Sequence, residues 1–215
     1  MKFKELLDVA PDARDGDWEK AFLATLPEAR VRILNPEPST GPGGWPYLFV
    51  GEATDVEVES EPLLQVLSWL STRGIGLALN PQKEVPDFVL TYGMVWNFRE
   101  RGQFLTEVTS DTRSGAIEVS AGQEVLTAQP TEQYLPPYAR AMVKQFLADQ
   151  GAFTPKIMMV SFDKKNYDLC FSIESLKSPP QEEHAGIAEA LSWFLPAHYT
   201  VSLVSEKALP GFQAL

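Results

Sequence analysis

The chain has few of the residues on which reactive centres usually depend. Its 215 residues include one cysteine, Cys170, and two histidines, His184 and His198. A single cysteine excludes an internal disulfide and is typical of a reducing compartment. A structural zinc site takes four cysteine or histidine ligands, which three such residues cannot supply within one chain. The sequence therefore predicts neither a disulfide nor a zinc site of this type.

The sequence also gives no indication of a nucleophilic centre. A catalytic serine or cysteine needs a base, usually histidine. His184 falls in the first turn of an expected helix and His198 in the turn before the last expected strand, and we interpret both as surface residues. Cys170 has no basic sequence neighbour, so we expect an unreactive thiol that is either a small apolar filler or partly exposed. We predict no catalytic residue.

Phosphate-binding and hard-cation motifs are incomplete. The glycine-rich stretch 41–44 leads into a strand instead of a helix, and Gly74-Ile75-Gly76 lacks the third glycine of the dinucleotide fingerprint. The EF-hand pattern is absent. Among 29 acidic residues, no catalytic pair can be selected from the sequence. We therefore predict no cofactor and no bound metal.

Long apolar runs and a basic charge balance are also missing. No apolar stretch approaches the roughly 18 residues that cross a bilayer, and charge interrupts residues 1–8, so we expect neither a membrane span nor a signal peptide. The 18 Lys and Arg against 29 Asp and Glu give a formal charge of −11. Acidic surfaces bind neither phosphate backbones nor anionic lipids well. We predict a cytoplasmic protein of bacterial style, without nucleic-acid or membrane partners.

The apolar pattern predicts an α+β fold made of two small sub-domains, each a mostly antiparallel sheet covered by helices on one face. The predicted domains are residues 1–110 and 134–215, with residues 111–133 as a boundary segment that is either a linker or a sheet extension. In the first domain we expect an Asp17-capped helix, a Ser60-capped helix over 61–73, and strands at 31–34, 47–50, 54–59, 75–79 and 88–92. Residues 93–102 are ambiguous between strand and helix.

The second domain has the order helix, strand, strand, helix, strand. Pro136 and Pro137 open the first helix, which runs to about Asp149. A capping box at 178–181 opens the second helix. The expected strands are 157–162, 167–173 and 200–204.

Two four-residue stretches suggest an internal repeat. Leu67-Ser68-Trp69-Leu70 and Leu191-Ser192-Trp193-Phe194 each end a helix that precedes a short turn and a strand. Either the two halves are related by duplication or the match is due to chance, because a repeat assignment normally rests on more than two periods.

Residues 134–204 resemble the C-terminal domain of the bacterial enhanced-serine-sensitivity family. The similar segments are Tyr134-Leu135-Pro136-Pro137-Tyr138, Pro155-Lys156-Ile157, Phe194-Leu195-Pro196 and Val201-Ser202-Leu203-Val204. The first half shares the general helix–strand order of that family. The resemblance implies a small two-domain α+β protein with an adaptor or regulatory role and no assigned catalytic residues.

Two groups of side chains are candidates for partner binding. The first contains Tyr92, Trp96, Arg99 and Arg101, because tryptophan, tyrosine and arginine dominate binding hot spots. The alternative is that Trp96 and Phe98 fill a core.

The second group is the carboxylate face formed by Asp55, Glu57 and Glu59 on an alternating strand. It would contact a basic partner, and the alternatives are a charged solvent edge or, less simply, a hard-cation site.

The leading functional hypothesis is a non-enzymatic, cytoplasmic protein-binding protein of adaptor, regulatory or immunity type. The alternative is a small-molecule-binding module or enzyme with a site between the two halves, lined by Tyr92, Trp96 and Arg99. The sequence predicts neither the identity of the partner nor the oligomeric state.

Overall fold

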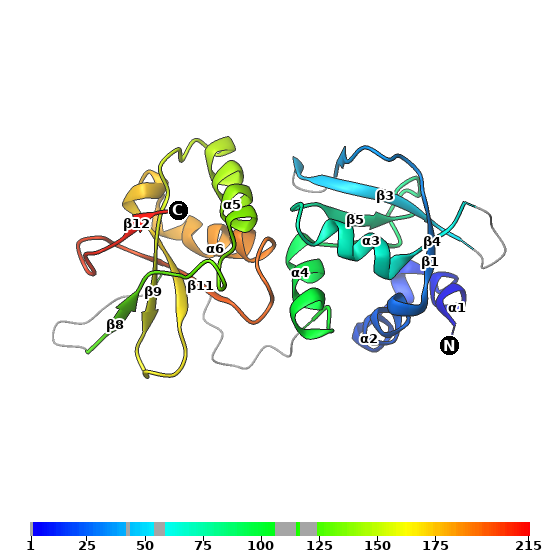
Figure 1. The fold of residues 1–215 in the computed structure, drawn as a ribbon, viewed down its shortest axis with the longest axis horizontal. Helices are drawn as coiled ribbons and strands as arrows, with labels where there is room; N and C mark the ends of the chain where they lie inside the picture. Colours follow the sequence, from blue (N-terminus) through cyan, green and yellow to red (C-terminus); the bar gives the residue numbers. More distant parts are fainter. Residues whose placement is uncertain (1, 42–43, 54–58, 106–114, 117–123) are drawn as a thin grey trace. The chain divides into compact units, whose positions relative to one another are not determined.

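The chain folds as two compact units (Figure 1). The structure is a computed structural model that describes residues 2–41, 44–53, 59–105, 115–116 and 124–215. The N-terminal unit is Met1–Phe104 and the C-terminal unit is Leu105–Leu215, so the division falls near the boundary predicted at residue 110. Each unit combines helices with a mixed sheet, which confirms the predicted α+β class.

The sheet of the N-terminal unit has the strand order β4-β1-β3-β5-β6, with β2 paired to β3. Its parallel pair is β3 with β5, and the other described pairs are antiparallel. The strands are β1 (Arg30–Ile33), β2 (Ser39–Thr40), β3 (Pro46–Glu52), β4 (Glu61–Pro62), β5 (Gly76–Leu79) and β6 (Phe88–Leu90).

Helices cover one face of this sheet and share a core with it. They are α1 (Phe3–Leu7), α2 (Gly16–Thr25), α3 (Leu63–Leu70) and α4 (Tyr92–Arg101), with 3-10 turns at Pro11–Ala13 and Leu26–Glu28. Alternate residues of the central strands, such as Leu48 and Val50 of β3, join the same buried cluster as Leu63 and Leu67 of α3. In Figure 1, α3 lies across the sheet beside β5.

The sheet of the C-terminal unit has the order β12-β9-β10-β11-β7, with β8 paired to β9. The pairs β10–β11 and β11–β7 are parallel, and the other described pairs are antiparallel. The strands are β7 (Gly115–Ala116), β8 (Leu126–Ala128), β9 (Lys156–Ser161), β10 (Asp168–Ser172), β11 (Thr200–Val204) and β12 (Gln213–Ala214). Because β7 and β8 lie within the predicted boundary segment, that segment contributes strands to this sheet.

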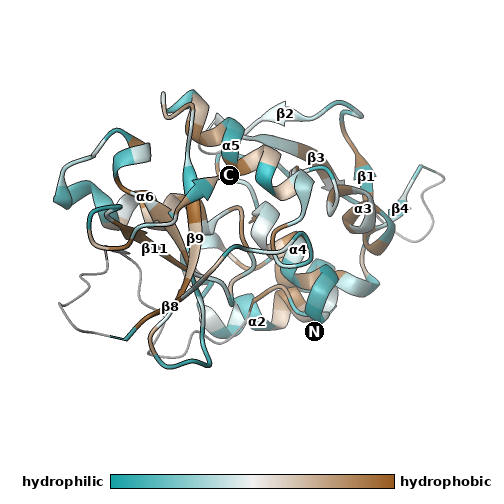
Figure 2. Cartoon of the chain, turned by 60° about the vertical axis from the view of Figure 1, so that its left-hand side comes forward, coloured by the Kyte–Doolittle hydropathy of each residue, from teal (hydrophilic) through white to brown (hydrophobic). Residues whose placement is uncertain are grey.

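Helices α5 (Pro137–Asp149) and α6 (His184–Ser192) belong to the C-terminal unit, with 3-10 turns at Glu174–Leu176 and Gln181–Glu183. Its strands are among the most apolar parts of the chain (Figure 2). A small cluster of Met158, Val160, Cys170 and Val204 is fully buried and packs against residues of the chain's last segment, such as Phe212. Cys170 is therefore an apolar filler, the first of the two predicted alternatives, and burial raises the pKa of its thiol.

The two units share one topology. The order α2-β1-β3-α3-β5 in the first matches α5-β9-β10-α6-β11 in the second. In both, the first two strands pair antiparallel, and the strand after the second helix pairs in parallel with the strand before it. The repeated tryptophans also agree, since Trp69 and Trp193 are 41% and 44% exposed. This likeness favours duplication over a chance match.

Residues 88–102 differ from the prediction. The predicted strand 88–92 ends at Leu90, and Tyr92 already belongs to α4. The Thr91 hydroxyl caps α4 by accepting from Met94 N at 3.2 Å, and Gly102 closes it with φ +70°. The apolar residues at 94, 96 and 98 alternate as they would in a strand. The segment is nevertheless a helix, because both of its ends are capped and it is buried on more than one side.

Three predicted helix starts are also wrong. Asp15, and not Asp17, caps α2 by accepting from Trp18 N at 2.8 Å. Ser60 accepts from Arg30 Nε at 2.9 Å instead of capping, and Pro62 precedes α3. The expected capping box at 178–181 does not form, because a 3-10 turn begins after Pro180. The predicted strand at 54–59 falls almost entirely outside the described residues.

A buried carboxylate joins distant segments of the N-terminal unit. Asp87 accepts from Arg14 Nη2 at 2.9 Å, from Asn80 Nδ2 at 2.6 Å and from the Lys83 ammonium. The Arg14 guanidinium also donates to the Leu7 carbonyl at 3.0 Å, which ties α1 to the β5–β6 turn. Burial alone would raise the pKa of Asp87, but the hydrogen bonds from Lys83, Asn80 and Arg14 outweigh it and lower the pKa.

Replacing this carboxylate should destabilise the N-terminal unit. We expect Asp87→Asn to lower the free energy of unfolding by about 3 kcal/mol at neutral pH, because Arg14 loses a buried ionic partner. Urea denaturation followed by fluorescence measures this. Because the folded-state pKa is lowered, the stabilisation is present above the unfolded-state pKa of about 4 and is lost as the pH falls below it.

The difference between wild type and Asp87→Asn should therefore shrink on acidification. Asp12→Asn is the control, since Asp12 is exposed on a 3-10 turn of the same unit. Equal unfolding free energies for wild type and Asp87→Asn at pH 7 would contradict the role assigned to this carboxylate.

Candidate protein-interaction site

The aromatic residues of the predicted cluster lie inside the structure. Tyr92 and Trp96 occupy the same side of α4, with ring centroids 6.1 Å apart, and are 2% and 1% exposed. The Tyr92 hydroxyl donates to the Ser71 carbonyl at 2.7 Å, directly after the end of α3. Tyr92 therefore positions α4 against the end of α3, and both side chains present little surface of their own.

The arginines of the cluster are exposed near the end of α4. A cation in the last turn is favourable there, because the helix dipole is negative at its C-terminus. Arg99 lies 3.9 Å from the nearest Glu100 oxygen and lines a hollow between α4 and α3. Arg101 is the last residue of α4 and does not line that hollow.

The predicted acidic face is described in part. Asp55 and Glu57 lie outside the described residues, whereas Glu59 is exposed. Glu61 follows on β4, where Val31 is its pairing partner, and it lines a second hollow beside α3. Acidic side chains are thus present close to the start of α3.

Helix α3 carries apolar side chains on its outer side as well as its inner side. Leu63, Val66, Leu67 and Leu70 are buried against the sheet. On an ordinary amphipathic helix the opposite side is polar. Here Leu64 and Trp69 are 44% and 41% exposed. They lie on opposite flanks of the helix, with the exposed Gln65 and Ser68 between them, and each borders a different hollow. Large exposed apolar side chains beside hollows are candidates for an interaction surface.

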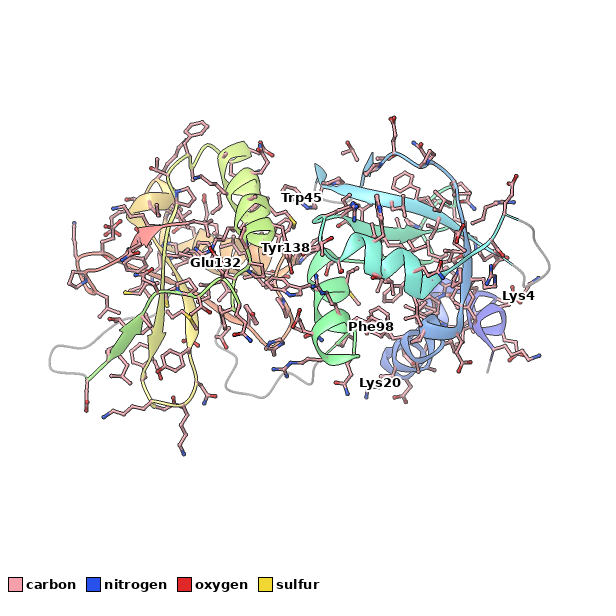
Figure 3. All side chains as sticks on the ribbon, viewed as in Figure 1. Lys4, Lys20, Trp45, Phe98, Glu132 and Tyr138 are labelled. Carbon is pink, nitrogen blue, oxygen red and sulfur yellow. The ribbon has the colours of Figure 1, made fainter. Side chains whose placement is uncertain are left out.

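Two hollows flank this helix. The first, of about 370 Å³, lies between α3 and α4 and is lined by Leu64, Leu67, Ser68, Ser71, Thr72, Val95, Phe98 and Arg99. The second, of about 320 Å³, lies between α3 and β1 and is lined by Ile33, Pro36, Leu48, Glu61, Gln65, Val66 and Trp69. Figure 3 labels Phe98 on α4, and its ring stacks on Phe104 at 4.3 Å between centroids.

An arginine holds the exposed tryptophan in place. The Arg73 guanidinium lies 4.3 Å from the centroid of the Trp69 ring, and its Nη1 donates to the Trp69 carbonyl at 2.7 Å. A cation over an indole face is attractive, and a fixed ring loses less entropy on binding. We name Leu64, Trp69 and Arg73, together with the two hollows, the α3 ridge.

Sequence reasoning overlooked the ridge. Leu67-Ser68-Trp69-Leu70 drew attention as one copy of a repeat, but not as a binding site. The available signal was the outward position of Trp69 and Leu64 on a helix whose inner stripe is Leu63, Leu67 and Leu70. Of the predicted aromatic–arginine segment, Phe98 and Arg99 line a hollow of the ridge.

The histidines differ from the surface positions expected for them. His184 is 8% exposed, and its Nε2 lies 2.9 Å from the Pro179 carbonyl, so its predicted surface position is wrong. His198 is partly buried with its ring edge-on to Tyr199. In the described part of the chain, no group of three or more His, Cys, Asp or Glu side chains could hold a metal ion. Nor, in those ranges, does a helix have the length and apolarity to cross a membrane.

Comparisons with protein-family models, curated proteins and solved structures returned no match to this chain.

The support that Tyr92 gives to α3 is testable. Tyr92→Phe removes a hydroxyl whose partner, the Ser71 carbonyl, is buried, and we expect a loss of about 1 kcal/mol in the free energy of unfolding. Arg101→Ala, at an exposed position on the same helix, should change stability by less than about 0.5 kcal/mol. Denaturant titration of both variants decides the matter, and an unchanged midpoint for Tyr92→Phe would be evidence against the support role.

Proposed function

We propose that this chain is a non-enzymatic protein-binding module and that the α3 ridge is its contact surface. The observation that carries the proposal is the pair of exposed apolar side chains, Leu64 and Trp69, between two hollows. Binding energy in protein interfaces concentrates in a few tryptophan, tyrosine and arginine residues, and the ridge places Trp69 under Arg73.

The form of the ridge suits a protein partner. A small ligand is usually enclosed in one deep concavity. A ridge with a hollow on each side instead fits a surface that inserts one group of side chains on either side of α3. The first hollow is lined by Ser68, Ser71 and Thr72 beside apolar walls, so its occupant would be apolar with a polar edge.

The charge balance favours a basic partner. The formal charge of −11 attracts positively charged proteins and accelerates their association. Glu61 lines the hollow beside Trp69, and Glu59 precedes it on the chain. A lysine or arginine of the partner could therefore pair with Glu61 while its aliphatic stem packs on Trp69.

The resemblance of residues 134–204 to the enhanced-serine-sensitivity family supports the same kind of role. That resemblance implies an adaptor or regulatory protein, for which a cytoplasmic location is proposed. An immunity-type protein that covers a basic toxin is one form of this function.

Removing the exposed apolar side chains should abolish partner binding. We expect Trp69→Ala, and Leu64→Ala with it, to weaken binding by at least tenfold, because each truncation removes an anchor from the centre of the surface. Affinity purification from the native source at physiological salt identifies a stoichiometric partner, and calorimetry with that partner measures the change.

Trp193→Ala is the matched control, because Trp193 has the same local sequence and a nearly equal exposure in the other unit. Both tryptophan variants should unfold within about 1 kcal/mol of wild type, since the ring is exposed. Equal losses of affinity in the two variants, or the absence of any stoichiometric partner, would refute the assignment to the α3 ridge.

The acidic side chains should act on the association rate. Reversing Asp55, Glu57 and Glu59 to lysine is expected to slow association with a basic partner at low ionic strength, with a smaller effect at high salt, where charges are screened. Stopped-flow or surface-based kinetics at two salt concentrations provide the measurement. Unchanged association rates at low salt would exclude this face from the encounter, whatever the role of Trp69.

A further inference from the structure

The C-terminal unit contains the largest of the hollows described. A groove of about 560 Å³ runs between α5 and α6. Its volume lies within the range of small-molecule sites in proteins. The residues that line it are Phe146, Leu147, Gln150, Ala152, Leu176, Lys177, Pro179, Glu183, Gly186, Ile187 and Ala190. In Figure 1 the two helices lie near one another in this unit.

The groove has one apolar end and one polar end. Phe146 of α5 packs on Phe194, just beyond the end of α6, with ring centroids 4.9 Å apart. Phe146 therefore lines the groove at the end where Ala190 lies. Gln150 follows one helical turn later and lies toward the start of α6, where Glu183 precedes the helix. The two charged residues of the lining, Lys177 and Glu183, both belong to the segment that precedes α6, whereas Phe146 and Ala190 line the opposite end.

A glycine keeps the groove open. Gly186 lies inside α6, where glycine destabilises a helix relative to alanine. Neither its backbone nor its packing requires glycine, because a Cβ at this position would have no atom within 4 Å. Glu183, Gly186 and Ala190 are spaced by three and four residues and so share one side of α6. Small residues there leave room beside the apolar wall.

The backbone holds the lysine of the groove in an unusual conformation. Lys177 and Ser178 are successive non-glycine residues with φ of +69° and +51°. Such left-handed backbone is sparsely populated and concentrates at binding and active sites. The Lys177 ammonium lies 5.9 Å from the Phe153 ring centroid and so close to Gly151 that a Cβ there would overlap it. Two neighbouring segments therefore position this charge at the mouth of the groove.

Lys177 lies over the Phe153 ring, but no opposite charge in the described ranges neutralises either group at this end. Within the described residues, neither Lys177 nor Glu183 takes part in an ion pair. Both residues are exposed, so both can meet a ligand. One cation and one anion beside an apolar channel complement a molecule that carries an anion, a cation and an apolar body.

We propose that this groove binds a free α-amino acid with an apolar side chain. The ligand carboxylate pairs with Lys177, its ammonium pairs with Glu183, and its side chain occupies the space beside Ile187 and Gly186. A simple fatty or aromatic acid fits less well, because Glu183 would repel a second anion at the same end. This site belongs to the C-terminal unit and is independent of the partner-binding surface on α3.

The test uses the full chain and ligands that differ by one group. Calorimetric or NMR titration with L-phenylalanine and L-leucine should give saturable binding. Loss of the ammonium in 3-phenylpropionate, loss of the carboxylate in 2-phenylethylamine, and loss of the apolar body in L-serine should each weaken binding at least tenfold. Equal binding of 3-phenylpropionate and L-phenylalanine would overturn the zwitterion assignment, and no saturable binding of either amino acid would overturn the site.

Four variants locate the binding. Lys177→Gln should weaken L-phenylalanine binding at least tenfold, whereas Lys165→Gln, on the exposed β9–β10 hairpin, should leave it unchanged. Gly186→Leu should block the groove, and Gly186→Ala should keep the helix while narrowing the space slightly. Thermal melting confirms that each variant is folded. Full affinity in a folded Gly186→Leu protein would place the ligand elsewhere and refute the proposal.

Discussion

Both candidate surfaces depend on one constraint, the parallel pairing of β3 with β5 and of β10 with β11. A tight turn cannot join two parallel strands, so the connecting chain must cross a face of the sheet, usually as a helix. That requirement places α3 over the N-terminal sheet and α6 over the C-terminal one. The inner side of each crossover helix is used for the core, and its outer side is available for function. The α3 ridge and the α5–α6 groove both lie on such outer surfaces.

The two units show how far a shared topology constrains a surface. Their strand order and pairing agree over the central part of each sheet, yet the neighbour of β5 is the antiparallel β6, whereas that of β11 is the parallel β7. In the first unit the chain continues from β6 into α4, which forms one wall of the hollow beside α3. In the second unit the helix beside the crossover is α5. The hollow of the first unit therefore uses α4, which follows the shared pattern, whereas the groove of the second unit uses α5, which is the counterpart of α2 within that pattern.

Apolar spacing was enough to predict most elements, because burial against one face imposes a period on the sequence. Leu63, Leu67 and Leu70 predicted α3, and residues 200–204 became β11 as expected. Residues 93–102 stayed ambiguous in the sequence because α4 is buried on several sides, so no simple period of apolar residues remains. The predicted serine caps at Ser60 and Ser178 were wrong because Pro62 and Pro180 directly precede the first turns of α3 and of the 3-10 turn before α6. The ridge was overlooked because Trp69 was counted with the apolar stripe of Leu63, Leu67 and Leu70, although its position on α3 lies outside that stripe.

The single thiol offers a consequence for the dynamics of the second unit. Cys170 is fully buried beside Met158 and Val204, and its environment disfavours the thiolate. A thiol-modifying reagent therefore reaches it when the surrounding strands separate, and the labelling rate reports the frequency of that opening. Since the chain has no other cysteine, this signal comes from one place without any engineered label. The native protein thus contains an intrinsic probe for local opening of the C-terminal sheet.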